Sequence, residues 1–305
     1  MFGISQLYNR PLILLFLTTI FWGGNTIAGK LAVGNVSPFV VVFLRWLIVS
    51  AIMLGLYWRE VVHNWHHMRP QIVMVAAMAA FGFTGFNALF YLAAHDTTAL
   101  NIGIIQGSVP MMVAIGAFVV YRSRLTVAQA LGIVITICGV VAVASRGSLE
   151  RLLEVEINPG DALMLLACLF YSGYTLALRN RPKVPALAFF AVTSTVAATV
   201  SVPLLLWEGM AGNMIWPDFN GWLICLYIAL FPSFIAQVFF MRGVELIGPG
   251  RAGIFVNLVP IFASVFAIVI LGEPFELYHG LALVLVLGGI YVSERFSHKE
   301  RPSHA

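Results

Sequence analysis

The sequence predicts an all-α integral membrane protein with ten transmembrane helices, arranged as two inverted five-helix repeats with the N and C termini in the cytoplasm. Three observations lead to this fold class. The 305 residues are 60% hydrophobic and only 10% charged, whereas a soluble domain carries roughly a quarter charged residues. The apolar residues fall in blocks of about 20, the length that crosses a ~30 Å hydrocarbon core. The two halves of the chain also resemble each other.

Ten apolar blocks are separated by short linkers, which hold most of the charged residues. The blocks cover residues 11–30, 38–58, 71–93, 99–121, 126–145, 160–179, 186–207, 221–243, 249–271 and 277–294. Strands of a membrane barrel alternate apolar and polar side chains, whereas residues 109–121 and 281–289 are apolar on every side. Each block therefore predicts a helix. The first block lacks a signal-peptide cleavage site, so we expect it to be retained.

The basic residues predict how the bundle is oriented. With the N-terminus in the cytoplasm, 13 of the 17 Lys and Arg residues fall in cytoplasmic segments. Only Lys30, Arg146 and Arg151 fall in outer segments, and Arg45 lies inside the second block. Cytoplasmic loops of membrane proteins carry an excess of Lys and Arg. We therefore expect both termini in the cytoplasm, and we attribute the net charge of +4 to orientation rather than to nucleic-acid binding.

The two halves match weakly but in the same order. Residues 14–30 align with residues 163–179 at an offset of 149, and further along the chain the offset is 150. The later matches pair Asn87 with Gln237, Gly103 with Gly253, Pro110 with Pro260 and Gly139 with Gly289. Five spans in each half reverse the direction of the second half, so the repeats are expected to be inverted. We place the repeats at 1–146 and 160–296, a linker at 147–159 and a cytoplasmic tail at 297–305.

Inverted repeats are the usual basis of alternating access in transporters, in which a central site opens first to one side and then to the other. Pro110 and Pro260 lie near the centres of the fourth and ninth blocks, where each removes a backbone donor. Their matched positions predict two symmetric hinges along the transport pathway. The carbonyl groups of Gln106 and Val256 are expected to be freed for the cavity.

Several motifs resemble those of a known family. These are F-W-G-G-N at residues 21–25, the two mid-helix prolines and L-G-E-P at residues 271–274. Together with the paired five-helix layout, they resemble the EamA-type branch of the drug/metabolite transporter superfamily over nearly the whole chain. The aromatic, weakly charged interior is most similar to the amino-acid exporters of that branch, aromatic amino-acid exporters among them. The two halves differ at one of these motifs. The first half has Arg122-Ser123-Arg124-Leu125 at the position where the second half has Gly272-Glu273-Pro274-Phe275.

The resemblance implies a secondary transporter of the inner (plasma) membrane, not an enzyme, with no cofactor and a small-molecule substrate. Polar side chains within membrane spans tend to face the bundle interior, and here they recur at helical spacing on single faces. The residues expected to bind substrate are Trp22, Asn25, Thr26, Thr84, Asn87, Tyr91, Tyr171, Tyr174, Gln237 and Asn257. Uncharged amide and hydroxyl groups among aromatic rings suit an amphipathic molecule with an apolar or aromatic body.

Arg45 has two interpretations: it binds a substrate carboxylate, or it snorkels or pairs with a backbone carbonyl, and we favour the structural role. An organic-phosphate or nucleotide-sugar carrier of the same superfamily is the alternative function, and it would need Arg45 and Arg251 in the cavity. A non-transporting membrane protein is a further alternative. Residues 24–30 imitate a phosphate-binding loop, but Leu31 replaces the Ser or Thr that holds Mg²⁺, so we expect no nucleotide.

Partners and metals are predicted from smaller signals. His63, His66 and His67 lie together in a cytoplasmic loop beside interfacial Trp residues, so no metal is expected there. Small residues spaced by four, at 103 and 107 and at 128 and 132, let helices approach closely. They predict internal packing first and dimerisation second. We therefore expect a monomer or weak homodimer in the lipid bilayer, with no nucleic-acid partner.

Overall fold

The computed structural model describes residues 8–148, 150 and 158–297, and within these residues every element is helical. The predicted linker at 147–159 and the tail at 297–305 lie largely outside the described residues. Eight helical segments are long and apolar enough to cross a membrane, and Leu277–Ser293 is a shorter apolar helix. One of the eight, Pro38–Asp96, has 59 residues and contains both the second and the third apolar blocks. All ten apolar blocks are helical, and the number of crossings stays a prediction.

The first half begins with two long helices. Its elements are α2 (Pro11–Ala32), α3 (Pro38–Met68), α4 (Ile72–Ala79), α5 (Phe86–Asp96), α6 (Ala99–Gln106), α7 (Val109–Tyr121) and α8 (Val127–Ala144). Proline starts both α2 and α3, where its fixed φ is compatible with the first helical turn. α3 runs ten residues beyond the predicted block, because residues 59–68 contain no proline or glycine to end the helix, although six of the ten are polar or charged.

The second half repeats this order. Its elements are α10 (Pro159–Ala177), α11 (Ala186–Met210), α12 (Phe219–Ile228), α13 (Ala236–Ile247), α14 (Pro249–Val256), α15 (Val259–Leu271) and α16 (Leu277–Ser297). Asn158 caps α10 by accepting from the backbone N–H groups of Gly160 and Asp161. Asp218 caps α12 in the same way through the N–H of Gly221.

Two kinds of interruption recur at matched positions in the halves. A π-helical turn, Ala80–Gly85, joins α4 to α5, and another, Ala229–Ile235, joins α12 to α13. A break separates α6 from α7 just before Pro110, and a second separates α14 from α15 just before Pro260. Proline cannot donate to the preceding turn, which explains the breaks. All four interruptions fall in the middle of apolar blocks.

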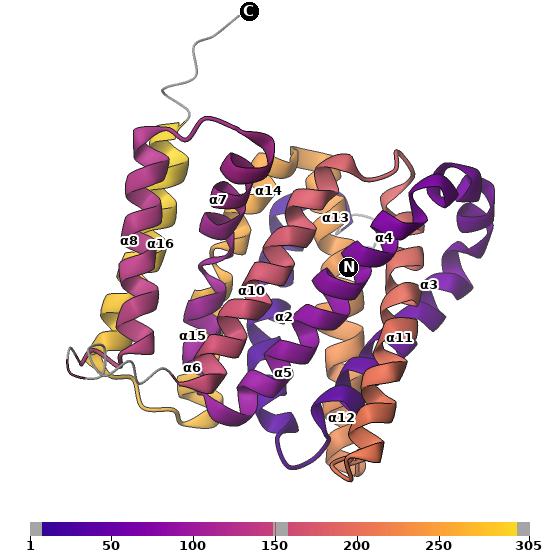
Figure 1. Ribbon diagram of the computed structural model, residues 1–305, viewed down its shortest axis with the longest axis horizontal. Coiled ribbons are helices and arrows are strands. Elements are labelled where there is room, and N and C mark those ends of the chain that lie inside the picture. The colour runs from indigo at the N-terminus through magenta and orange to yellow at the C-terminus, as the bar shows by residue number, and fades with distance from the viewer. Residues whose placement is uncertain (1–7, 149, 151–157, 298–305) are drawn as a thin grey trace, which may run out of the picture.

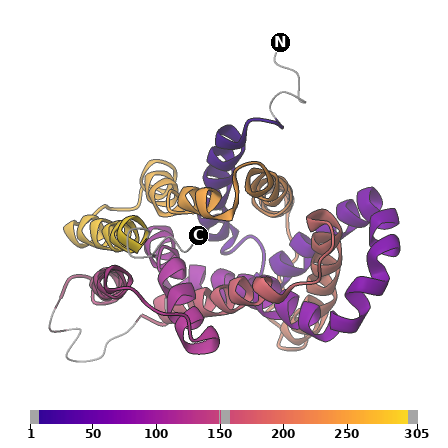
Figure 2. The same cartoon turned by 90° about the horizontal axis from the view of Figure 1, so that it is seen from above.

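Helices pack mainly across the two halves. α3 packs against α11, α8 against α16, α5 against α10, and α2 against both α13 and α15. Seen from above, the α8–α16 pair and the α3–α11 pair lie at opposite edges of the bundle (Figure 2). In the side view the long helices run roughly parallel, with α2, α5 and α10 between these two pairs (Figure 1). The centre of the molecule is therefore built from helices of both halves.

Small residues lie at several of these helix contacts. A Cβ on Gly103 of α6 would lie 2.5 Å from the Cβ of Ala263 on α15. Gly132 of α8 approaches the backbone carbonyl of Gly289 on α16 closely. Gly103 and Gly132, each from one of the predicted small-residue pairs, therefore lie at helix contacts within the molecule. Small residues allow helices to approach closely in membrane bundles.

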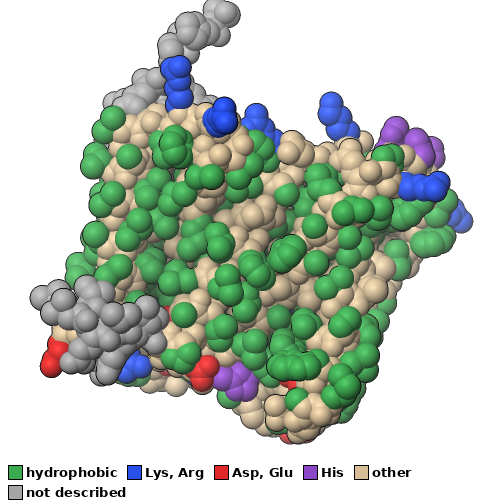
Figure 3. Space-filling model, viewed as in Figure 1, with side chains coloured by type: hydrophobic (Ala, Val, Ile, Leu, Met, Phe, Trp, Pro, Cys, Tyr) green, Lys and Arg blue, Asp and Glu red, His purple; other side chains and the backbone are tan. Residues whose placement is uncertain are grey.

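Charged side chains separate toward the two ends of the bundle. Most Lys, Arg and His side chains in Figure 3 lie along one edge, and Asp and Glu lie along the other, where a basic side chain and a His are also seen, with an apolar band between the edges. At the second edge three carboxylates hold helix starts together. Glu208 accepts from Ser37 Oγ at 2.6 Å, Asp161 from Thr97 Oγ1 at 2.5 Å, and Glu273 from the N–H groups of Ala99 and Leu100 at 2.8 Å each. We call this edge the acidic end and the opposite edge the basic end.

Candidate functional site

A cavity lies at the centre of the bundle, where the π turns and the proline breaks of both halves meet. It encloses about 870 Å³ of empty space, including the part open to solvent. The side chains and backbone that line it are Trp22, Asn25, Arg45, Trp46, Gly82, Phe83, Phe86, Asn87, Gln106, Gly107, Val109, Pro110, Tyr171, Pro232, Ser233, Gln237, Val256, Asn257, Val259 and Pro260. Most of the lining is apolar or aromatic, as in sites for small molecules.

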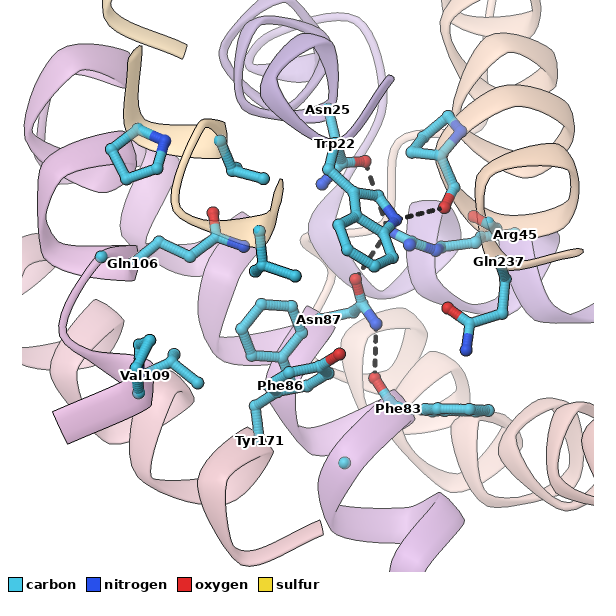
Figure 4. A pocket seen from close by; sticks show the side chains of 18 of the residues that line it. Trp22, Asn25, Arg45, Phe83, Phe86, Asn87, Gln106, Val109, Tyr171 and Gln237 are labelled. Carbon is cyan, nitrogen blue, oxygen red and sulfur yellow. Dashed lines mark hydrogen bonds between the residues drawn. The ribbon is translucent and has the colours of Figure 1, made fainter. Parts of the chain in front are cut away.

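Arg45 of α3 organises a polar cluster on one side of the cavity. Its Nη1 donates to Asn87 Oδ1 at 2.6 Å, to the Tyr91 hydroxyl at 2.8 Å and to Asn25 Oδ1 at 3.3 Å. The Tyr91 hydroxyl in turn donates to Asn25 Oδ1 at 3.2 Å, and Asn87 Nδ2 donates to the Phe83 carbonyl at 2.6 Å. Figure 4 shows Asn87 and Asn25 directed toward the guanidinium group. Helices α2, α3 and α5 are thereby joined through one cation.

An aromatic wall lines the cavity next to this cluster. The Trp46 and Phe83 rings stack with centroids 4.6 Å apart and an angle of 6° between planes. The Phe86 and Tyr171 rings lie 5.2 Å apart at 47°. Such pairs add about 0.5–1.5 kcal/mol each beyond the area that they bury. Because the rings come from α3, the first π turn, α5 and α10, the wall spans both halves of the chain.

The structure brings six of the ten predicted binding residues to the cavity surface: Trp22, Asn25, Asn87, Tyr171, Gln237 and Asn257. The predicted hinge residues Pro110 and Pro260 also line the cavity, as do Gln106 and Val256, whose carbonyl groups were expected to be freed there. Trp22 is held in place because its indole N–H donates to the Pro232 carbonyl at 3.0 Å, within the second π turn.

The other four predicted residues lie behind the lining. Thr26 is fully buried within the bundle, and the Thr84 hydroxyl donates to the Ala197 carbonyl of α11 at 2.9 Å. Tyr91 lies one layer deeper than Asn25, which it contacts. The Tyr174 ring packs 5.2 Å from that of Phe83 and 5.6 Å from that of Tyr171. Of the four, Tyr91 supports the polar cluster and Tyr174 supports the aromatic wall from outside the lining.

The structure changes the partners expected for Arg45. The favoured structural role was snorkelling or pairing with a backbone carbonyl, whereas the guanidinium group donates to three side chains, and the residue also lines the cavity. Substrate binding by Arg45 and its structural role both stay predictions. Arg251, required beside it for the phosphate-carrier alternative, is exposed on α14 and does not line the cavity. Sequence reasoning also missed Trp46, Phe83 and Phe86 as lining residues and anticipated only the backbone carbonyl of Gln106, since apolar and amide residues in a helix buried all round give no facing signal.

Comparison with known proteins is consistent with this architecture. The EamA-like transporter family model matches residues 9–145 and again residues 158–294. The uncharacterized transporter YetK of Bacillus subtilis is 28% identical over 273 residues, covering 89% of this chain and 82% of that protein. An uncharacterized transporter of Archaeoglobus fulgidus is 24% identical over 300 residues, covering 95% of this chain and 99% of that protein.

Two further comparisons concern a named activity and a solved structure. The S-adenosylmethionine/S-adenosylhomocysteine transporter of Chlamydia muridarum is 24% identical over 285 residues, with 89% of this chain and 88% of that protein covered. A solved crystal structure superposes on this chain with a TM-score of 0.67 and is 18% identical in sequence, covering 95% of this chain and 99% of the other. At this identity the likeness establishes a shared fold and nothing about activity. Because the family model covers both halves, the chain belongs to the EamA-like transporter family of multi-pass membrane proteins.

Proposed function

We propose that this chain is a secondary transporter that exports amino acids, aromatic and amphipathic ones in particular, and related metabolites across the inner (plasma) membrane. The observation that carries the proposal is the central cavity, whose lining combines a polar cluster around Arg45 with an aromatic wall. A solute with polar groups at one end and an apolar or aromatic body matches both surfaces. The cargo is bound and moved unchanged, without a cofactor.

The proposed mechanism is alternating access of two inverted repeats, residues 1–146 and 160–296, around the cavity. Ten crossings, with both termini in the cytoplasm, put the basic end of the bundle at the cytoplasmic face, in accord with the distribution of charges. The breaks before Pro110 and Pro260 act as hinges, because residues there have no complete helical hydrogen bonding to resist bending. The recurrence of breaks and π turns in both halves supports this mechanism.

The relative from Chlamydia muridarum supports the cargo class. S-adenosylmethionine and S-adenosylhomocysteine both contain an amino-acid group and an aromatic base, so that relative's cargo is amphipathic as well. The alternative of an organic-phosphate or nucleotide-sugar carrier is less well supported. Among the described residues that line the cavity, Arg45 is the single cation, and a phosphate dianion calls for more positive charge.

The proposal is tested by reconstituting the purified protein in liposomes and measuring efflux of a panel of radiolabelled amino acids. We expect flux above that of empty liposomes for L-phenylalanine, L-tryptophan or L-methionine. Asn87→Leu removes an acceptor of Arg45 and should lower this flux at least about tenfold, since a charge-assisted hydrogen bond contributes about 1.5–3 kcal/mol.

Asn64→Leu is the matched control, because this exposed amide bonds only the Glu60 carbonyl in the α3 segment outside the cavity. It should leave flux unchanged. Absence of flux for every amino acid in the panel would contradict the proposed function. Equal losses of flux in Asn87→Leu and Asn64→Leu would show that the cavity has no specific role in transport, and would contradict the assigned site.

A further inference from the structure

Arg45 is a buried cation that lacks a counter-ion in the described part of the chain. The residue is 7% exposed, and its three hydrogen-bond partners, Asn25, Asn87 and Tyr91, are all neutral. Among the described residues the only ion pair between side chains is Arg242–Glu245, on α13. An uncompensated charge inside a membrane protein is energetically costly. The site therefore favours any ligand that brings a negative charge.

Two donors next to the cavity have no partner. Arg45 Nε and Trp46 Nε1 are both buried without a hydrogen bond, and both residues line the cavity. The guanidinium carbon lies 5.2 Å from the centroid of the Trp46 ring, so the two groups are neighbours. In contrast, the indole N–H of Trp22 is already bonded to a carbonyl. Two free donors on one cation-bearing surface suit the two oxygens of a carboxylate.

An acceptor without a partner lies on the other side of the cavity. The side-chain oxygen of Gln106 is buried and has no hydrogen bond. Gln106 belongs to the end of α6, and in Figure 4 its side chain and Arg45 approach the cavity from opposite sides. The described lining contains no Asp or Glu. A cationic group of a ligand would therefore find a neutral acceptor here, whereas an anionic group would find a full opposite charge.

We propose that Arg45 and Trp46 bind the carboxylate of the cargo and that Gln106 accepts a hydrogen bond from its ammonium group. Phe83, Phe86 and Tyr171 then pack against the apolar body. This inference rests on the proposed function and narrows it to α-amino acids and other carboxylate-bearing amphipaths, with simple amines excluded. Recognition is dominated by the carboxylate, because that group alone meets an opposite charge in the cavity.

The test compares three solutes that differ by one charged group: L-phenylalanine, phenethylamine without the carboxylate, and 3-phenylpropionate without the ammonium. Binding to the purified full chain is measured by the rise in Tm that each solute produces, which gives an apparent Kd. We expect phenethylamine to bind about 10- to 100-fold more weakly than phenylalanine, as loss of a charge-assisted contact predicts. The loss for 3-phenylpropionate should be below about tenfold.

Variants assign these differences to residues. Arg45→Gln should abolish the preference for phenylalanine over phenethylamine, and Gln106→Leu should abolish only the preference over 3-phenylpropionate. Trp46→Phe retains an aromatic ring beside Phe83 and removes the indole N–H together with part of the indole, so it should reduce the carboxylate preference by about tenfold or more, in the range of a hydrogen bond to a charged group. This variant keeps the test decisive if Arg45→Gln unfolds.

Equal weakening of all three solutes by Arg45→Gln or Trp46→Phe would overturn the proposal, since a merely structural role affects every ligand alike. Equal affinity of the unaltered protein for phenylalanine and phenethylamine would also overturn it. Failure of the proposed function has a different signature: the protein discriminates the solutes in binding but moves none of them in liposomes. That result would retain the carboxylate site and reject transport of these cargoes.

Discussion

The fourth and ninth apolar blocks have matched sequences but opposite patterns of burial. In the fourth, every residue of α6 from Ala99 to Ile105 is buried, whereas α7 has no buried residue. In the ninth the order is reversed: α14 buries only Ala252, whereas α15 buries five residues. Each block is broken at the same place, before its proline, so the difference does not come from the helices themselves.

This difference in burial shows at which end of the bundle the helices pack more tightly. α6 and α15 pack against each other at the acidic end, while α7 and α14 lie at the basic end (Figure 1). If the two halves were packed identically, α6 and its counterpart α14 would be equally buried. Packing between the halves is therefore asymmetric, and it is tighter toward the acidic end. Substitutions at matched positions of α6 and α14 test this comparison directly.

The largest difference is expected at Ile104 and its counterpart Ile254. Ile104 is fully buried and Ile254 is 54% exposed. Ile104→Ala should lower the free energy of unfolding by about 2–5 kcal/mol, because a cavity remains in a packed site. Ile254→Ala should cost less than about 1 kcal/mol. Thermal unfolding of the two purified variants measures this, and equal costs would show that the ends are packed alike.

A smaller effect is expected from overpacking at Gly103. A new side chain there meets Ala263, whereas at the counterpart Gly253 the space within 4 Å is empty. Gly103→Leu should destabilise the protein by about 1–3 kcal/mol. Gly253→Leu should be neutral or stabilise it by about 0.5–1 kcal/mol, because it removes glycine from a helix. A lower Tm for Gly253→Leu than for Gly103→Leu would reverse the comparison.

The smallest effect is expected where Glu273 caps α6. Its two oxygens accept from the N–H groups of Ala99 and Leu100 at 2.8 Å each. Glu273→Ala should cost about 1–2 kcal/mol, as loss of a helix cap does. Hydrogen exchange of the peptide around residues 97–102 should accelerate locally, since these two amides lose their acceptors.

Ser123 occupies the matched position in the first half, within the departure from L-G-E-P noted in the sequence. Ser123→Ala is the control and should change the stability by less than about 0.5 kcal/mol. If exchange around residues 97–102 does not change in Glu273→Ala, the carboxylate does not hold this end of α6.

The helices could be predicted from the sequence because an apolar block of about 20 residues is long enough to cross a membrane and satisfies its backbone there as a helix. The breaks before Pro110 and Pro260 were also predictable, since proline removes a backbone donor. The π turns were not. Pro232 lies in the second turn, but Ala80–Gly85 contains no proline, and hydropathy is unaffected by a change from i−4 to i−5 hydrogen bonds.

The site was predictable only in part. Helical spacing placed Trp22 and Asn25 on one face of α2, and both line the cavity. The same spacing failed for Thr26, whose side chain turns into the packed interior, and for Tyr174, which lies behind Phe83. The partners of Arg45 were not predictable, because sequence gives no rotation for a helix that is apolar on all sides. Tertiary packing supplies that rotation.

The π turn between α4 and α5 sets the rotation of everything that follows it. A π turn contains one residue more than an α turn, so the helix after it is rotated by about 100° relative to an uninterrupted helix. Asn87 and Tyr91 reach Arg45 because of that added residue. Deletion of a single residue such as Gly82 would restore a regular helix and turn both partners away from the guanidinium. The polar cluster thus depends on the residue count of a helix as much as on its composition.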